Sequence, residues 1–108
     1  MALSTEEVSR LDDVKKQRYM LLERLFEHDG WNLLVGWANM EAAGQLVRLI
    51  NALTWEDSRL AAGARAAFMM MASIEEIMEV EFRGYANEAI QAEVEAEEDK
   101  AANEAGNQ

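Results

Sequence analysis

Hydrophobic residues recur along most of this chain at intervals of three and four residues, which places them on one face of an α-helix. Short polar residues that can cap a helix N-terminus divide this pattern into segments. Ser4 and Glu7 have the spacing of a capping box, and helically spaced apolar positions follow as far as Phe26. We therefore expect a first helix at about 5–27, with a weaker apolar stripe near Arg18.

The run His28-Asp29-Gly30 interrupts the pattern, and Asp29 can cap a second helix at about 30–52. Gly44 lies on the apolar face of this helix. It either allows a close approach of another helix or is a tolerated defect, since glycine is a poor helix former. The stripe expected to pack consists of Leu33, Leu34, Trp37, Met40, Val47, Ile50 and Leu53.

Two further helical segments complete the pattern. Thr54 and Asp57 predict a third helix at about 55–72, whose many alanines would let helix axes approach to the close end of about 8–10 Å. Ser73 with Glu76 is another capping pair, and a fourth helix is expected at about 74–97. The sequence is compatible with either a break or a kink at 73–74.

The final segment, 98–108, is acidic and polar, and like charges should make it fray. The predicted fold is all-α: a small bundle of three to four helices that forms one domain at 1–97, followed by this tail. Composition supports the prediction, because half of the 108 residues are hydrophobic and there is no proline.

The formal charge of −11 is unevenly distributed. Residues 1–73 contain 10 acidic and 8 basic side chains, whereas 74–108 contain 11 and 2. Direct binding to nucleic acid is not expected, because phosphates require basic residues and the group Lys15, Lys16 and Arg18 is flanked by carboxylates. That mixed-sign group is typical of a solvated helix face.

The absence of cysteine excludes disulfides and thiolate metal sites. The acidic start of the chain lacks the order of a secretory signal, and no apolar run approaches the roughly 20 residues of a membrane span. The single histidine, His28, suits a helix end better than a catalytic group, and one histidine cannot supply a helical di-iron site. We expect no catalytic, cofactor or metal site, and hence no enzyme.

Aromatic and methionine residues are the candidates for protein contacts. Trp31, Trp37 and Trp55 are expected in the core. Three consecutive methionines at 69–71 span about 200° of a helix, so they cannot all face one seam. Exposed methionine suits an adaptable interface, and the thin apolar stripe of the fourth helix either closes the bundle or docks on a neighbour. The interface candidates are Met69, Met70, Phe82 and Tyr85.

A series of short motifs suggests a relationship to a known group of proteins. They are Leu22-x-x-Leu25-Phe26-x-His28-x-Gly30-Trp31, then Thr54-Trp55-Glu56, then Gly63-x-x-Ala66-x-Phe68 before Glu75-Glu76. Over residues of about 20–80 the chain resembles small, largely uncharacterised all-helical proteins of tailed bacteriophages. The resemblance implies a minor virion component at the portal, internal core or head–tail region, and it transfers no functional residue.

Two functions follow from these observations. The first is a non-enzymatic structural protein of a phage particle, a homo-oligomer or part of a larger viral assembly, found in the virion or the host cytoplasm. The alternative is an acidic regulator whose C-terminal helix imitates nucleic acid and inhibits a host DNA-binding protein. A helix-turn-helix DNA binder would need a basic recognition helix, and none of the four expected helices is basic.

Overall fold

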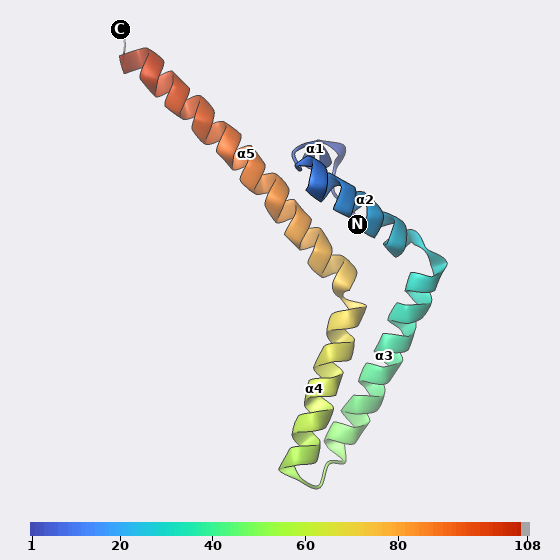
Figure 1. The fold of residues 1–108 in the computed structure, drawn as a ribbon. Coiled ribbons are helices and arrows are strands. Elements are labelled where there is room, and N and C mark those ends of the chain that lie inside the picture. The colour runs from blue at the N-terminus through green and yellow to red at the C-terminus, as the bar shows by residue number, and fades with distance from the viewer. Residues whose placement is uncertain (107–108) are drawn as a thin grey trace. The chain divides into compact units, whose positions relative to one another are not determined.

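The computed structural model describes residues 1–106. Every regular secondary-structure element in this range is an α-helix, as predicted. Figure 1 shows α1 (Thr5–Ser9), α2 (Asp13–Glu27), α3 (Asp29–Ile50), α4 (Trp55–Ala72) and α5 (Ile74–Gly106). No helix in the described range is long and apolar enough to cross a membrane.

The predicted continuous helix at about 5–27 is wrong, because the chain breaks after Ser9. The capping box itself forms: the Ser4 hydroxyl accepts from the Glu7 N–H at 3.1 Å, and the Glu7 carboxylate accepts from the Ser4 N–H at 3.0 Å. The Asp12 carboxylate then accepts from the Lys15 N–H at 2.8 Å and begins α2. The turn between the helices directs Leu11 into the core, where 5% of its surface remains exposed.

The second predicted helix begins one residue early and uses a different cap. His28, not Asp29, is the N-cap residue of α3, and its Nδ1 accepts a hydrogen bond from the Gly30 N–H at 2.9 Å. A Cβ at position 30 would lie 3.0 Å from that Nδ1. Glycine therefore leaves the imidazole room to cap the helix.

The remaining junctions agree more closely with the sequence. The Thr54 hydroxyl accepts from the Asp57 N–H at 3.1 Å and caps α4. The chain breaks at 73–74: α4 ends at Ala72, and α5 begins at Ile74. At this break the Ser73 N–H donates to the Met69 and Met70 carbonyls, each at 3.1 Å.

The fourth helix is longer than predicted, because α5 continues past 97 as a regular helix over 98–106. This segment is rich in alanine and glutamate, which have high helix propensity. Just before it, the Gln91 side chain donates to the Glu95 carboxylate one turn later, at 3.3 Å. Propensity here outweighs the repulsion on which the prediction rested. Residues 107–108 of the predicted tail lie outside the described range.

Contacts group the chain into two compact units. Unit 1 comprises the described residues of Met1–Leu22 and Met78–Gln108, and unit 2 comprises Glu23–Ile77. The bundle of three to four helices is not confirmed, because within residues 1–106 only α3 and α4 pack closely along their lengths. The single domain at 1–97 stays a prediction.

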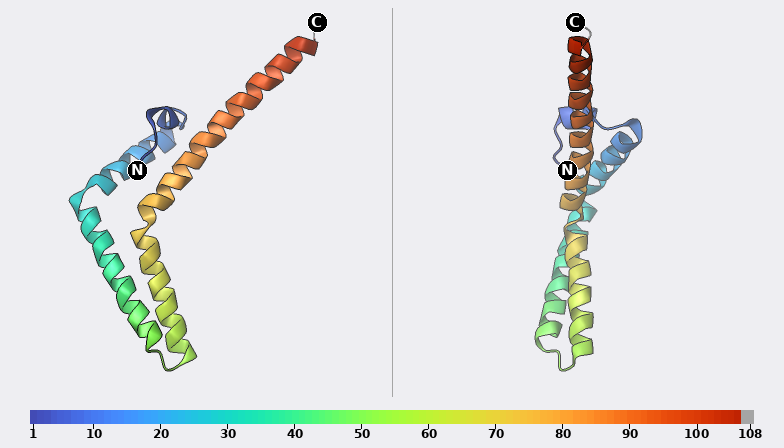
Figure 2. Two further views of the ribbon diagram at one scale, coloured as in Figure 1. Left: turned by 180° about the vertical axis from the view of Figure 1, so that it is seen from behind. Right: turned by 90° about the vertical axis from the view of Figure 1, so that its left-hand side faces the viewer.

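Unit 2 is built around an antiparallel hairpin of α3 and α4, which lie side by side in every view (Figures 1 and 2). In unit 1 the segments of α2 and α5 are separated by aromatic side chains. The core of unit 1 contains Leu11, Tyr19, Phe82 and Ala86, with Met1, Leu3, Val8, Leu22 and Tyr85 packed against it.

Candidate functional site

The core of unit 1 is organised by three aromatic rings. Phe82 on α5 meets Tyr19 of α2 edge-on, with ring centroids 5.6 Å apart, and meets Tyr85 at 5.7 Å with the rings nearly perpendicular. The Tyr19 hydroxyl accepts a hydrogen bond from the Leu3 N–H at 3.2 Å, so the N-terminal segment is fixed to the same ring. Edge-to-face pairs add stability beyond the apolar area that they bury.

Charged side chains border this aromatic cluster on one side. The Lys15 ammonium lies 4.4 Å from the centre of the Tyr85 ring, a cation–π contact. The Tyr85 hydroxyl donates to the Glu81 carboxylate at 2.6 Å, and this hydrogen bond raises the pKa of Tyr85 above its ordinary value.

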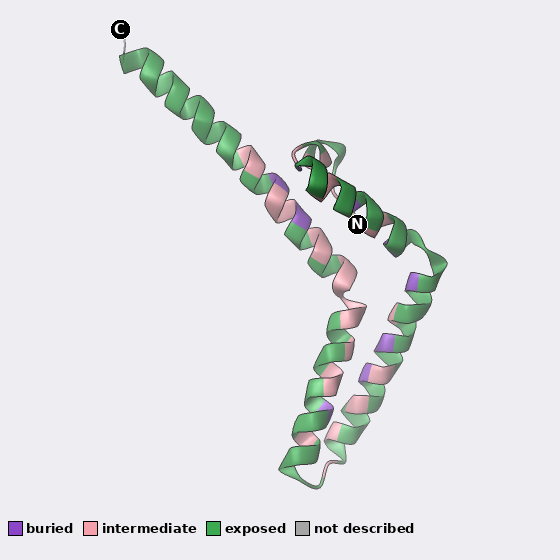
Figure 3. Ribbon diagram, in the orientation of Figure 1, coloured by how far each residue is buried: buried purple, intermediate pink, exposed green. Residues whose placement is uncertain are grey.

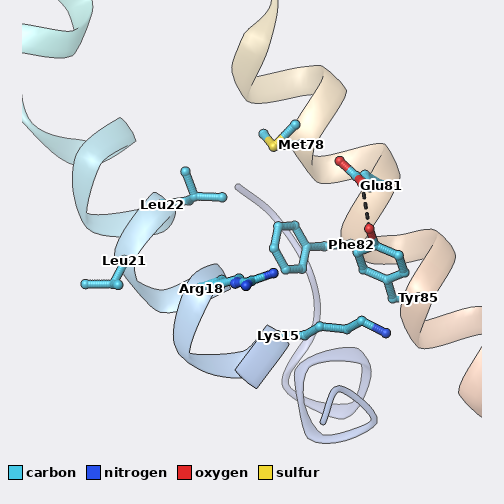
Figure 4. A pocket seen from close by; sticks show the side chains of 8 residues that line it. All are labelled: Lys15, Arg18, Leu21, Leu22, Met78, Glu81, Phe82 and Tyr85. Atoms are coloured by element: carbon cyan, nitrogen blue, oxygen red, sulfur yellow. Dashed lines mark hydrogen bonds between the residues drawn. The ribbon is translucent and has the colours of Figure 1, made fainter. Parts of the chain in front are cut away.

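These residues border a cavity of about 440 Å³ within unit 1 (Figure 4). The aromatic rings and aliphatic side chains form its apolar lining, and charged groups stand at its edge. Such a cavity suits a ligand that has an apolar group next to a polar one. The lining residues are Lys15, Arg18, Leu21, Leu22, Met78, Glu81, Phe82 and Tyr85.

Ion pairs connect α5 to the N-terminal segment of unit 1. Arg83 donates from Nε to Glu7 at 3.2 Å and from Nη2 to Glu79 at 3.1 Å and to the Ala2 carbonyl at 3.3 Å. The hydrogen bond to Glu79 raises the pKa of Arg83, and the Ser4 N–H lowers the pKa of Glu7. Arg10 pairs with Glu93. These contacts favour a structural role for the charges of unit 1.

Unit 2 packs its hairpin through small side chains. The less exposed positions of α3 alternate by four and three residues, the spacing of a coiled-coil seam, and we call them the inner seam. Ala38 is fully buried, and Ala42 and Ala61 of α4 are nearly so. Trp37 contacts Phe68 edge-on at 5.5 Å at the margin of the seam. The inner seam consists of Trp31, Val35, Ala38, Ala42, Gln45 and Leu49.

The opposite side of α3 is apolar and exposed. At about 100° per residue it lies roughly half a turn from the inner seam, and we call it the outer face. Leu33, Met40 and Ile50 keep 77%, 75% and 73% of their surface exposed. Figure 3 shows exposed positions over most of the hairpin. The outer face consists of Leu33, Gly36, Met40, Ala43, Val47 and Ile50, again alternating by three and four residues.

The outer face contains much of the stripe that sequence reasoning expected to pack. Periodicity identified an apolar face correctly, but α4 packs against the smaller residues of the inner seam instead. The signal that could have identified the seam is the run of small residues at Ala38 and Ala42 with matching alanines in α4. Trp31 is buried as expected, whereas Trp37 and Trp55 are 46% and 80% exposed, so their predicted core positions are wrong.

The four interface candidates lie in different environments. Met69 and Met70, on α4 in unit 2, are exposed, with Met70 at 64%. Phe82 and Tyr85, on α5 in unit 1, belong to the aromatic cluster, where Phe82 is buried and Tyr85 is half-buried. Phe82 is thus a core residue in this conformation. An interface role for Met69, Met70 and Tyr85 stays a prediction.

The described residues contain no group of three or more carboxylate or histidine side chains placed to hold a metal ion. His28 is engaged in capping α3. Residues 91–106 of α5 are helical, exposed throughout and strongly acidic. Three features of the described residues are candidate functional sites: the outer face, the cavity of unit 1 and the acidic end of α5.

Comparison with models of protein families, with curated proteins and with solved structures gives no match to this chain.

Proposed function

We propose that this chain is a non-enzymatic structural protein that assembles with other protein chains through the hairpin of unit 2. On the sequence resemblance, the assembly is a bacteriophage particle, in which the chain is a minor component of the portal, internal core or head–tail region. The observation that carries the proposal is the outer face, a continuous apolar stripe on a helix whose opposite side already packs on α4.

The composition of the hairpin supports an interface that is apolar and not electrostatic. Residues 30–74 contain only three acidic and three basic side chains, whereas 29% of the whole chain is charged. Large exposed apolar patches are uncommon on proteins that act alone, and they mark interaction sites. The six charged residues of this stretch are Glu41, Arg48, Glu56, Asp57, Arg59 and Arg65.

Mass spectrometry of purified particles of the phage that encodes the chain tests this function. We expect several copies per particle. A Val47→Glu substitution on the outer face should remove the protein from particles, because assembly would have to bury a carboxylate in an apolar contact. The matched control is Val80→Glu on α5, where the valine is 69% exposed and lies in unit 1. Absence of the wild-type protein from particles contradicts the proposal.

The acidic end of α5 favours a second candidate function, inhibition of a host DNA-binding protein by imitation of nucleic acid. Residues 91–106 contain six acidic side chains and one basic one, all on an exposed helix. Such a surface could engage lysines and arginines arranged for phosphates.

Competition with duplex DNA tests this second candidate. A captured host protein should release the chain when duplex DNA or salt is added, because both weaken contacts between opposite charges. Neutralising Glu97, Glu98 and Asp99 as Gln, Gln and Asn should abolish capture. The matched control neutralises three acids elsewhere, Glu23, Glu27 and Glu41, as Gln. Capture that is insensitive to salt, or equal loss in both variants, contradicts imitation of nucleic acid.

A further inference from the structure

The cavity of unit 1 combines an apolar lining with charged side chains. Its volume is about 440 Å³, and the apolar part of the lining consists of Leu21, Leu22, Met78, Phe82 and Tyr85 (Figure 4). Leu21 is 58% exposed and Met78 is half-buried, so the chain itself leaves part of this lining uncovered. Ligand pockets in proteins have volumes of about 300–1,000 Å³ and mostly apolar linings. The cavity is therefore large enough for a small molecule with an apolar body.

Three charged side chains also line the cavity, and two of them have partners within the chain. Glu81 accepts a hydrogen bond from the Tyr85 hydroxyl at 2.6 Å. Lys15 pairs with Asp12 at 3.5 Å and lies over the Tyr85 ring. Arg18 makes no ion pair and no side-chain hydrogen bond with any residue of 1–106. Its guanidinium is therefore the charged group of the cavity that is available to a ligand.

Arg18 is directed toward the cavity. In Figure 4 its side chain extends from α2 toward Phe82 of α5. Its charge also reaches Tyr85: the Glu81 hydrogen bond raises the pKa of this phenol, and the charge of Arg18 acts in the opposite direction. A guanidinium presents its donors in a fixed fork that matches the two oxygens of a carboxylate. The cavity thus places a carboxylate-binding group beside apolar side chains.

We propose that this cavity binds an apolar carboxylic acid of the size of a medium-chain fatty acid. Its carboxylate pairs with Arg18, and its hydrocarbon chain lies against Phe82 and the aliphatic side chains of the lining. Lys15 adds a second positive charge to the site. The site lies in unit 1 and is separate from the hairpin of unit 2, on which the proposed function rests.

Other classes of ligand fit these residues less well. A cationic ligand would meet Lys15 and Arg18, and the one carboxylate of the lining is already bonded to Tyr85. The described residues of unit 1 contain 13 acidic and 6 basic side chains, which repel a polyanion or an anionic membrane. A peptide would bring backbone amides into the cavity, where the lining has no neutral polar side chain left to pair with them.

Titration of the full-length chain with octanoate, followed by the ring NMR resonances of the tyrosines, tests the site. Octanoate should shift the resonances of Tyr85, which lines the cavity, more than those of Tyr19, which does not. The expected Kd is about 1 mM or lower. Hexanoate should bind about 15-fold more weakly, because each buried methylene contributes about fourfold to affinity. Octanol should bind at least about tenfold more weakly, because it has no carboxylate to pair with Arg18.

Two variants separate the pairing with Arg18 from a general effect of charge. Arg18→Gln should weaken octanoate binding at least about tenfold and leave octanol binding unchanged, because only the carboxylate loses its partner. The matched control is Arg24→Gln. Arg24 is exposed on the same helix, carries the same charge and does not line the cavity. This control should change octanoate binding by less than about twofold, because salt screens exposed charges.

Several results would overturn the inference. Equal affinity for octanol and octanoate would show that the carboxylate is not recognised. Equal weakening by Arg18→Gln and Arg24→Gln would show a response to overall charge. A larger shift at Tyr19 than at Tyr85 would place the acid outside the cavity, and no shift in millimolar octanoate would show that the cavity does not bind it.

Discussion

The two units of this protein bury side chains in different ways. Unit 1 places large rings between helix segments, with Tyr19 and Phe82 at 2% and 5% exposure, and surrounds them with ion pairs. Unit 2 brings two helices together through alanines and leaves most of its large apolar side chains exposed. Unit 2 contains the more hydrophobic stretch of the sequence, yet its large apolar side chains are less buried than those of unit 1. Unit 1 covers most of its large apolar side chains, although Val14, Leu21 and Val80 stay exposed, whereas unit 2 leaves a whole apolar face of α3 exposed.

The aromatic residues allow the two units to be observed separately. All three tryptophans, Trp31, Trp37 and Trp55, lie in unit 2, and both tyrosines, Tyr19 and Tyr85, lie in unit 1. Tryptophan fluorescence therefore reports on unit 2, and the ring NMR resonances of the tyrosines report on unit 1.

The largest effect is expected from emptying the core of unit 1. Phe82→Ala should lower the free energy of unfolding of unit 1 by about 3–5 kcal/mol, because it removes a buried ring and leaves a cavity. Urea titration followed by the tyrosine resonances measures this change. Val80→Ala on the same helix is the control, and it should change stability by less than about 0.5 kcal/mol. Equal effects of the two substitutions would show that Phe82 is not a core residue.

The inner seam of unit 2 should respond to added volume. Ala38→Leu is expected to destabilise the hairpin by about 1–3 kcal/mol, because the alanine is fully buried where α3 meets α4. Ala43→Leu adds the same atoms on the outer face and should leave the stability of a dilute, monomeric chain nearly unchanged. Urea titration followed by tryptophan fluorescence compares them. A larger loss for Ala43→Leu would reverse the assignment of inner and outer faces.

A smaller effect is expected at the cap of α3. His28→Ala should cost unit 2 about 1 kcal/mol, because the Gly30 N–H loses its side-chain acceptor. His28→Asn keeps an acceptor and should restore most of the stability. The same tryptophan-detected titration measures both variants. If alanine and asparagine give equal stability, the imidazole does not cap the helix.

The smallest effect should come from the half-buried Glu7 carboxylate of unit 1. The pKa of Glu7 is lowered from its ordinary value of 4.5, mainly by the Ser4 N–H, so the ionised form stabilises the folded state. This contribution is complete above pH 4.5 and is lost as pH falls through the lower folded-state pKa. Glu7→Gln should weaken the fall in stability of unit 1 below pH 4.5, measured by tyrosine-detected urea titrations. An unchanged pH profile would contradict this linkage.

Much of the local structure could be predicted from the sequence. Ser4 and Thr54 begin helices as predicted, and the acidity of the C-terminal third remains a property of one helix. The break after Ser9 could have been predicted from Asp12, a second capping residue inside an apolar pattern. The helix over 98–106 is consistent with the high helix propensity of alanine and glutamate, which here exceeds the repulsion between neighbouring carboxylates.

The candidate site was harder to predict than the helices. Met69 and Met70 are exposed, as an interface requires, but Phe82 closes the core of unit 1. The apolar residues of α5 have the same spacing whether they pack in the core or contact a partner, so the sequence does not distinguish the two roles. A capping role for His28 also could not be distinguished from a position at the end of the preceding helix, because both place it beside Gly30.

The sequence by itself determined that the described chain is helical, where most of its helices begin, and that residues 30–74 are rich in apolar side chains and have no net charge. These properties depend on capping residues and spacing, which act over a few positions. Only the tertiary structure decided which face of α3 is buried. Both of its faces have coiled-coil spacing, and α4, whose alanines permit close approach, packs on the small residues of the inner seam. The bulkier outer face therefore remains exposed.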